Sequence, residues 1–381
     1  MAFALTTAYI VLAYLSPAAL FPHLARHNIM VWLAVAATLA CLPQAPFRWR
    51  SAYLYLMLGL TAAVPVSLIA NEKSGTAMHG LREFLVSGIV FFLTFTAVDT
   101  VRKLRLLAFA IVISAIFLLS QSLYGWHRDG LNSQYVYRQH IYDSQGDVIG
   151  EFPRLQSVGI LEDPNGFAQY LLVAASLLTL AWTEGRFRRN IALVMLPAAF
   201  LLYGILATHS RGGLIGLAVL VFFLLEKKFG KIISLAIAGG LLGILFWAGA
   251  QGPRPTSISP RDPATVGRVG VGQSGIAMVR TSPLFGVGFN MFRVRNPSLT
   301  AHNAFLLCLS ELGIFGVLFW LGLIVLSIWD LNKIDDANGI RIALFTFLAT
   351  GLFLPSTYVM TFFLLIGIAA AAHYLRPITE T

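Results

Sequence analysis

The feature that most constrains this chain is a succession of long apolar runs, separated by polar segments, along all of its 381 residues. Many runs reach the ~20 residues that an α-helix needs to cross the hydrocarbon of a bilayer. Hydrophobic residues make up 57% of the chain and charged residues only 12%, and a soluble domain with this balance could not cover its surface with polar groups. The sequence therefore predicts an all-α, polytopic integral membrane protein that forms one domain over residues 1–381.

We expect about twelve transmembrane helices. The first apolar run has no basic segment before it, so we interpret it as a retained span and not as a cleaved signal peptide. Cys41 and Cys308 both lie in apolar runs, so we expect neither a disulfide nor a cysteine metal site. The predicted spans cover residues 4–22, 29–43, 51–70, 83–98, 104–122, 159–182, 191–207, 212–226, 231–249, 302–329, 340–354 and 357–374.

Lysine and arginine are distributed unevenly between alternate connections of these spans. If the N-terminus lies in the cytoplasm, the short inner segments hold 14 of these residues and the short outer loops hold 4. Positive charge concentrates on the cytoplasmic loops of membrane proteins. The pattern predicts that both termini are cytoplasmic and that two longer loops, residues 123–158 and 250–301, face the opposite side.

The loop over residues 250–301, between the predicted ninth and tenth spans, carries six arginines, no lysine and a single acid, Asp262. Loops of this length are usually functional or disordered. The planar guanidinium of arginine suits bidentate contact with phosphate oxygens. We therefore favour phosphate recognition by this loop; the alternative is a solvated basic loop beside anionic lipid headgroups. The arginines are Arg254, Arg261, Arg268, Arg280, Arg293 and Arg295.

Arg211 lies in the segment THSRGGLIGL, between two apolar runs at the outer edge of the membrane. A charge at this depth must be paired or must face a polar cavity. Gly212 and Gly216 have the spacing that allows a helix to approach a neighbour closely. The functional interpretation is a phosphate clamp at headgroup level, and the alternative is an interfacial anchor that extends to water.

His302 and Asn303 stand where the predicted tenth span begins, in the segment TAHNAFLLCLSELGIFG. The first turn of a helix has unpaired N–H groups and a positive dipole end, and neighbouring arginines add positive charge. Both effects disfavour imidazolium, so we expect a neutral ring that can act as a general base. The alternative is a capping or interfacial histidine, and Asn303 can serve simply as a helix cap.

Three further residues of this span carry expectations. Gly313 and Gly316 are three positions apart, so we expect them to share one helix face and to permit tight helix packing. Glu311 lies too far along the helix to touch His302. We expect it to be a buried acid paired with a polar group on another span.

The segment LEDPNGFAQYLL begins the predicted sixth span, also from the outer side. Asp163 followed by Pro164 is typical of an N-cap with proline at the first helical position. The functional alternative is that Glu162, Asp163 and Asn165 line a polar cavity that opens outward.

Several chemistries have no support in the sequence. The remaining histidines show no metal-ligand spacing, so we expect no metal site. The sequence contains no Walker A motif, no dinucleotide-binding glycine motif and no nucleophile elbow, which argues against nucleotide-driven chemistry. We expect no cofactor and no nucleic-acid partner.

The motifs around His302 resemble those of the O-antigen ligase family. The family signature, His-Asn, nine residues, then Gly-x-x-Gly, is matched by His302, Asn303, Gly313 and Gly316. The segment SRGGLIGL resembles the family's Ser-Arg-Gly segment, and GRVGVGQSGIAMVRTSPLFGVGFNMF resembles the stretch that leads from a Gly-Arg pair to a Pro-Leu-h-Gly-h-Gly turn. An aromatic residue often found after the Gly-Arg pair is absent here. The resemblance covers the second half of the chain, whereas the first half matches in hydropathy and topology alone.

The resemblance implies a glycosyltransferase of the bacterial inner membrane whose active site faces the periplasm. Its donor would be an undecaprenyl-diphosphate-linked glycan, its acceptor lipid A-core or another glycan, and its surroundings membrane lipids, with no metal or cofactor. It implies that His302 is the catalytic base, that Arg211, Arg280 and Arg268 bind the diphosphate, and that the apolar spans hold the polyprenyl tail. Supporting candidates are Asn303, Arg293, Arg295, Asp163 and Asn165.

Other functions stay open at this point. Within the family, an O-antigen or exopolysaccharide polymerase or a protein O-oligosaccharyltransferase would use the same donor chemistry. A lipid-linked glycan transporter would also explain many spans and polar residues within them, but the two halves of the sequence show no repeat and no paired broken helices.

Overall fold

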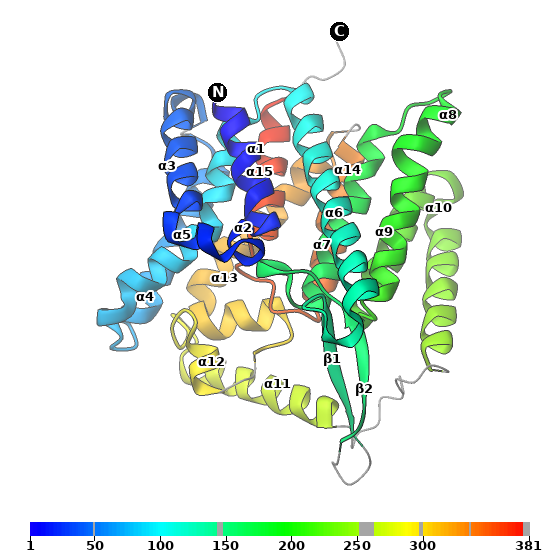
Figure 1. The fold of residues 1–381 in the computed structure, drawn as a ribbon. Coiled ribbons are helices and arrows are strands. Elements are labelled where there is room, and N and C mark those ends of the chain that lie inside the picture. The colour runs from blue at the N-terminus through cyan, green and yellow to red at the C-terminus, as the bar shows by residue number, and fades with distance from the viewer. Residues whose placement is uncertain (49, 143–147, 251–262, 297–299, 335–336, 376–381) are drawn as a thin grey trace.

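The computed structural model describes residues 1–48, 50–142, 148–250, 263–296, 300–334 and 337–375. Most of this chain is helical, and the elements follow one another in the order of Figure 1. The α-helices are α1 (Ala2–Leu15), α2 (Pro17–Leu20), α3 (Ile29–Cys41), α4 (Ala52–Ile69), α5 (Ser74–Ala97), α6 (Val101–Asp129), α7 (Pro164–Leu177), α8 (Phe187–Asn190), α9 (Leu196–Ala207), α10 (Arg211–Ala250), α11 (Pro263–Thr281), α12 (Met291–Arg295), α13 (Ala304–Leu331), α14 (Asn338–Gly351) and α15 (Met360–Tyr374). Shorter 3-10 or π segments are η1 (Pro22–His27), η2 (Leu42–Arg48), η3 (Gly130–Asn132), η4 (Gly159–Leu161), η5 (Leu178–Ala181) and η6 (Ile191–Met195).

Six helical segments of the described chain are long and apolar enough to cross a membrane: Ala52–Ile69, Ser74–Ala97, Val101–Asn132, Phe187–Ala207, Arg211–Ala248 and Ala304–Leu331. Ala2–Leu15, Ile29–Gln44 and Met360–Tyr374 are apolar but shorter. The segment from Arg211 is two helices, because Gly230 has a φ of 76° and breaks it between the predicted eighth and ninth spans. These helices agree with the predicted polytopic helical membrane protein, and the number of twelve spans stays a prediction.

Two helices form the centre of the bundle. In α15 every residue from Met360 to Ala372 is buried, and in α7 every residue from Phe167 to Leu177 is buried. A helix that is apolar on all sides belongs inside a larger assembly of helices. The peripheral helices α3 and α10 expose large apolar side chains instead, such as Trp32 and Ile232, as a surface that faces lipid would.

One strand pair departs from the all-α prediction. Within the outer loop over residues 123–158, α6 continues to Asp129, and β1 (Val136–Tyr142) then pairs antiparallel with β2 (Val148–Leu155). The register places Tyr137 opposite Arg154 and His140 opposite Glu151. Alternating side chains suit a half-buried hairpin, and this hairpin extends from the end of the bundle in Figure 1.

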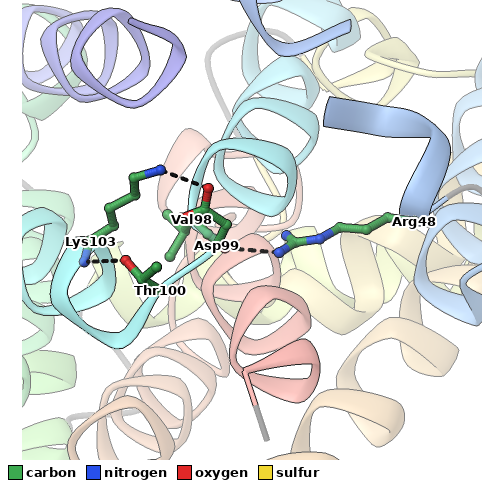
Figure 2. A network of polar contacts seen from close by, with 5 residues as sticks. All are labelled: Arg48, Val98, Asp99, Thr100 and Lys103. Atoms are coloured by element: carbon green, nitrogen blue, oxygen red, sulfur yellow. Dashed lines mark hydrogen bonds and ion pairs between the residues drawn. The ribbon is translucent and has the colours of Figure 1, made fainter. Parts of the chain in front are cut away.

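Polar contacts gather at the two ends of the bundle. At the end where α1 begins and α15 finishes, Arg48 donates Nη2–H to the Val98 carbonyl at 3.1 Å, and Lys103 Nζ pairs with Asp99 at 2.7 Å (Figure 2). The Thr100 hydroxyl caps α6 through the Lys103 N–H. The hairpin, α11 and α12 lie at the opposite end (Figure 1). The described parts of the two long loops therefore lie at the end opposite the start of α1 and the end of α15, and the orientation of the chain in a membrane stays a prediction.

Candidate functional site

Arg211 is the first residue of α10, and its loop is fixed by its neighbours. The Ser210 side chain is fully buried and its Oγ accepts the N–H of Gly213 at 3.1 Å, while its carbonyl accepts the N–H of Leu214. Serine is a preferred N-cap because it satisfies an N–H of the first turn. The Ser-Arg-Gly segment thus places a half-buried arginine at the positive end of a helix.

Arg154 holds this loop from the hairpin, and the sequence reasoning missed it. Its side chain is 5% exposed. Its Nε–H donates to the Thr208 carbonyl at 2.9 Å, its Nη2–H to Asn165 Oδ1 at 2.7 Å and its Nη1–H to Gln139 Oε1 at 3.3 Å. Because these bonds to a buried guanidinium are strong, Arg154 fixes the positions of the segments that supply the three acceptors. Its signal in the sequence was a lone arginine within a strand-like stretch of the first outer loop.

The hairpin also packs against the residue before the cap. The Phe152 ring contacts the His209 ring edge to face, with centroids 4.7 Å apart. His209 has a φ of 49°, an uncommon conformation for a residue with a side chain, and one that loops hold through their surroundings. Arg154 and Phe152 of β2 therefore supply two contacts to the connection between α9 and α10.

The start of α7 joins the same network. Asp163 is the N-cap, with Oδ2 accepting the Gly166 N–H at 2.9 Å, and Pro164 follows it, as predicted. Asn165 accepts from Arg154 and from the Ser210 hydroxyl (2.9 Å), and donates to Asp163 Oδ1 at 3.2 Å. Asn165 thus ties α7 to α10.

His302 lies in front of the cap of α13. The helix begins at Ala304, and Asn303 Oδ1 accepts the N–H groups of Phe305 and Leu306, both at 2.9 Å. The expectation that Asn303 caps this helix is confirmed. His302 stands one residue before the cap and not in the first turn as expected, and its side chain is exposed.

The loop between α14 and α15 connects the Arg211 segment with the His302 segment. The Thr357 hydroxyl donates to the Ala304 carbonyl at 2.6 Å. On the other side, a Cβ built on Gly212 would lie 3.4 Å from the Cβ of Phe353. Two segments that are far apart in the sequence therefore contact a single short connection, and this brings the starts of α10 and α13 to the same end of the bundle.

Gln169 of α7 holds the end of α14 and the α14–α15 loop in place. Its Nε2 donates to the Phe347 carbonyl at 3.1 Å and to the hydroxyls of Thr350 (2.7 Å) and Ser356 (3.3 Å). Gln169 is 4% exposed, and a buried amide in an apolar helix is held by such bonds. The polar side chain within an apolar run was the signal for this contact.

Helix α11 lies across the end of the bundle (Figure 1) and packs on the first turns of α13. A Cβ on Gly275 would lie 2.8 Å from the Leu306 side chain, and Val271 and Met278 belong to a small buried cluster that includes Ala301 and Leu307. Arg280 is exposed near the end of α11, and Arg268 lies within its first half. Arg254 and Arg261 lie outside the described residues.

Gly313 interrupts α13, which corrects the expectation that it shares a helix face with Gly316. Its φ is 65°, and a Cβ there would clash with Gly286 N and Leu284 O. Gly313 thus admits the turn over residues 283–288 and not a neighbouring helix. Gly316 is buried, and its closest neighbour is the Leu312 side chain of the preceding turn.

The turn over residues 283–288 replaces the helical hydrogen bonds that α13 loses at this break. Ser310 O and Glu311 O accept the N–H groups of Val287 (2.8 Å) and Gly288 (3.0 Å). The N–H groups of Ile314 and Phe315, which would have bonded those carbonyls in an unbroken helix, donate to Pro283 O (2.9 Å) and Leu284 O (3.0 Å). The glycine turn and the broken helix are one interlocked unit.

Glu311 is buried, as expected, and the Tyr358 side chain, at the start of the predicted twelfth span, lies beside its carboxylate. Its Oε1 accepts the backbone N–H of Phe292 at 3.1 Å, in the short helix α12. Arg293 and Arg295 follow Phe292 and are both exposed. In the described residues, no group of three His, Cys, Asp or Glu side chains is placed to hold a metal ion.

Three capped helix starts, those of α7, α10 and α13, therefore meet at one end of the bundle together with Arg211 and His302. Helix N-termini and arginines both favour an anion. Arg293, Arg295 and Arg280 are exposed on elements that pack against α13 at the same end. Positive charge and helix N-termini therefore gather at the end of the bundle that also holds the exposed His302 side chain.

No curated protein matches the chain. The family model described as O-antigen ligase matches residues 196–321, roughly a third of the sequence. The matched region runs from the start of α9 into the middle of α13. It contains Arg211, Arg280, His302, Gly313 and the turn over residues 283–288. The match at residues 196–321 is to the same family that the His-Asn and Ser-Arg-Gly motifs resemble.

Proposed function

We propose that this protein transfers a glycan from undecaprenyl diphosphate to an acceptor hydroxyl on the periplasmic side of the bacterial inner membrane. The donor glycan is O-antigen and the acceptor is lipid A-core. The family domain supports glycosyl transfer. The observation that carries the proposal is the α14–α15 loop, which contacts Gly212 beside Arg211 and Ala304 beside His302 and so joins a cationic segment to a candidate base.

In this proposal the arginines bind the lipid diphosphate. Arg211 is the principal contact, because it starts a capped helix whose dipole also favours an anion. Arg280 and Arg268 of α11 contribute further positive charge. The guanidinium groups stabilise the negative charge that develops on the diphosphate as the glycosidic bond breaks. Arg293 and Arg295 stand as supporting contacts.

His302 is the general base of this proposal. The imidazole takes the proton from the acceptor hydroxyl, and the oxygen of that hydroxyl attacks the anomeric carbon of the donor sugar. The bond between that carbon and the diphosphate oxygen breaks, and the electron pair leaves with the lipid diphosphate. Attack from the face opposite the leaving group inverts the anomeric centre. Asn303 fixes the start of α13, and Asp163 and Asn165 fix the start of α7.

Purified protein in lipid vesicles tests this function directly. Undecaprenyl-diphosphate-linked O-antigen and lipid A-core are supplied on the same side, and both products are followed. A transferase yields a larger acceptor and free undecaprenyl diphosphate. A transporter changes only the side on which the donor is found, and that outcome would refute the proposal.

Deletion of the gene identifies the acceptor. Loss of all long glycan from lipid A supports the ligase. A single repeat on lipid A would indicate a polymerase, and unchanged lipopolysaccharide with altered glycoproteins would indicate a protein-directed transferase. Complementation with the His302→Ala variant, at equal abundance, controls for effects that do not depend on transfer.

A further inference from the structure

Glu311 is a buried acid at the point where α13 breaks. It is 2% exposed, and Gly313, two residues further on, interrupts the helix. Oε1 accepts the Phe292 N–H, and the Tyr358 side chain of the α14–α15 loop also lies beside the carboxylate. Burying a carboxylate costs free energy unless it is fully paired. Helix packing by itself does not require an acid at this position. A buried charged group that breaks the usual rules of core composition often marks a functional position.

Glu311 bonds the short helix α12, and the position of this helix depends on its contacts with other elements. This helix covers only Met291–Arg295, and so short a helix is not stable by itself. Two contacts at Phe292 hold it. The backbone N–H binds Glu311, and the ring is fully buried in the cluster that contains Ala301 and Leu307, on either side of the α13 cap.

These contacts also fix the place of Arg293, because it belongs to the same short helix. It follows Phe292 directly, and its side chain is exposed. The Glu311 carboxylate, which accepts the N–H of the neighbouring Phe292, attracts its positive charge. The Asn290 side chain, before α12, donates to Glu83 Oε2 at 2.8 Å and so fixes the other end of this short segment. The position of the Arg293 backbone therefore depends on a carboxylate that lies within α13 itself.

We propose that Glu311 is a positioning residue: it fixes α12 on the broken helix so that Arg293 can bind a phosphate group of a lipid substrate. The inference rests on the proposed transferase function. The phosphate belongs either to the donor diphosphate or to a phosphorylated acceptor lipid, and both carry the oxygen pattern that a guanidinium binds bidentately. Glutamine at this position would keep an acceptor for the Phe292 N–H but would lose the charge that acts on Arg293.

The test is a double-mutant cycle in the full-length protein, with the vesicle assay described above. The variants are Glu311→Gln, Arg293→Ala and the pair. Apparent KM is measured separately for undecaprenyl-diphosphate-linked O-antigen and for lipid A-core, and binding of undecaprenyl diphosphate alone is measured as a second readout. Ser310→Ala is the matched control, because Ser310 is fully buried beside Glu311 and its hydroxyl donates to the Leu307 carbonyl of its own helix.

We expect Arg293→Ala to raise the KM for one of the two lipids about tenfold or more, as for loss of a charged hydrogen bond. Glu311→Gln should raise the same KM, and the pair should be no worse than Arg293→Ala alone. The lipid whose KM changes identifies the phosphate. Ser310→Ala should leave both KM values unchanged.

Three results would overturn the inference while leaving the transferase function intact. One is an Arg293→Ala variant with normal KM for both lipids, which decides the matter even if Glu311→Gln does not fold. The others are a Glu311→Gln variant that loses thermal stability with both KM values normal, and effects of the two substitutions that multiply. A wild-type protein that transfers no glycan refutes the proposed function instead.

Discussion

At the scale of single residues, the candidate site is built from helix caps. Asp163, Ser210 and Asn303 each satisfy backbone N–H groups at the start of a helix. Capping residues are favoured there for the same local reason in any protein. In this chain Arg211 follows the cap Ser210 and His302 precedes the cap Asn303. The capped helix ends therefore position the arginine proposed to bind phosphate and the histidine proposed as the base.

Replacing His302 by alanine should remove transfer without preventing accumulation in the membrane. The side chain is exposed and lies outside α13, so its loss leaves no cavity in the bundle. Loss of a general base is worth roughly 100- to 10,000-fold in rate, which the vesicle assay measures. His140→Ala, at an exposed position of the hairpin, is the matched control and should be normal. A purified His302→Ala protein with near wild-type turnover would contradict the assignment.

Replacing Arg211 by lysine separates a phosphate ligand from an interfacial anchor. Lysine keeps the charge but not the planar fork that binds two phosphate oxygens, so a sharp drop in activity is expected. An anchor would tolerate the change. Arg82→Lys, at an exposed arginine within α5, serves as control. Normal transfer by Arg211→Lys at equal protein abundance would remove Arg211 from the site.

At the scale of elements, the broken helix α13 and the turn over residues 283–288 act as one unit. The exchange of four backbone hydrogen bonds requires two backbones to touch, and only glycine permits this at Gly286 and Gly313, which both have positive φ. The family signature therefore has a physical meaning here. Gly313 of this signature breaks the helix, and the turn that contains Gly286 packs into the break.

Gly313→Ala should consequently destabilise the protein. The Cβ would meet Gly286 N and Leu284 O, which belong to backbone and cannot move aside easily, and a positive φ costs about 1–2 kcal/mol for a residue with a Cβ. We expect a clear fall in melting temperature together with lower activity. Gly239→Ala, where no atom lies within 4 Å of the added Cβ, should be neutral or slightly stabilising. Equal melting temperatures for the two variants would argue against the interlocked unit.

At the scale of the whole molecule, the two ends of the bundle differ in composition. One end holds Arg48, Lys103, the Tyr53–Asp330–His373 contacts and the Arg341–Glu226 pair, and the other holds the hairpin, α11 and the helix starts of the candidate site. The orientation of these two ends in the membrane stays a prediction from the charge bias of the loops.

Cysteine labelling tests this orientation. Single cysteines are introduced at Gln273, exposed on α11, and at Glu184, exposed in the connection between η5 and α8, after the buried Cys41 and Cys308 are replaced by serine. A membrane-impermeant reagent added to intact cells should label position 273 and leave position 184 unmodified until the membrane is opened. The reverse pattern would place the candidate site in the cytoplasm and would exclude a periplasmic transferase.

The sequence by itself determined the class of protein, the places of its apolar helices and the caps at Asp163 and Asn303, because burial in lipid and helix capping are local properties that each segment carries. The family motif also identified Arg211 and His302 as candidates. Tertiary structure alone decided the rest. The buried contacts of Arg154, the α14–α15 loop between Gly212 and Ala304, and the turn that fills the break at Gly313 all join residues that are distant in sequence. No local pattern specifies such pairs, since each depends on where the other elements of the bundle pack.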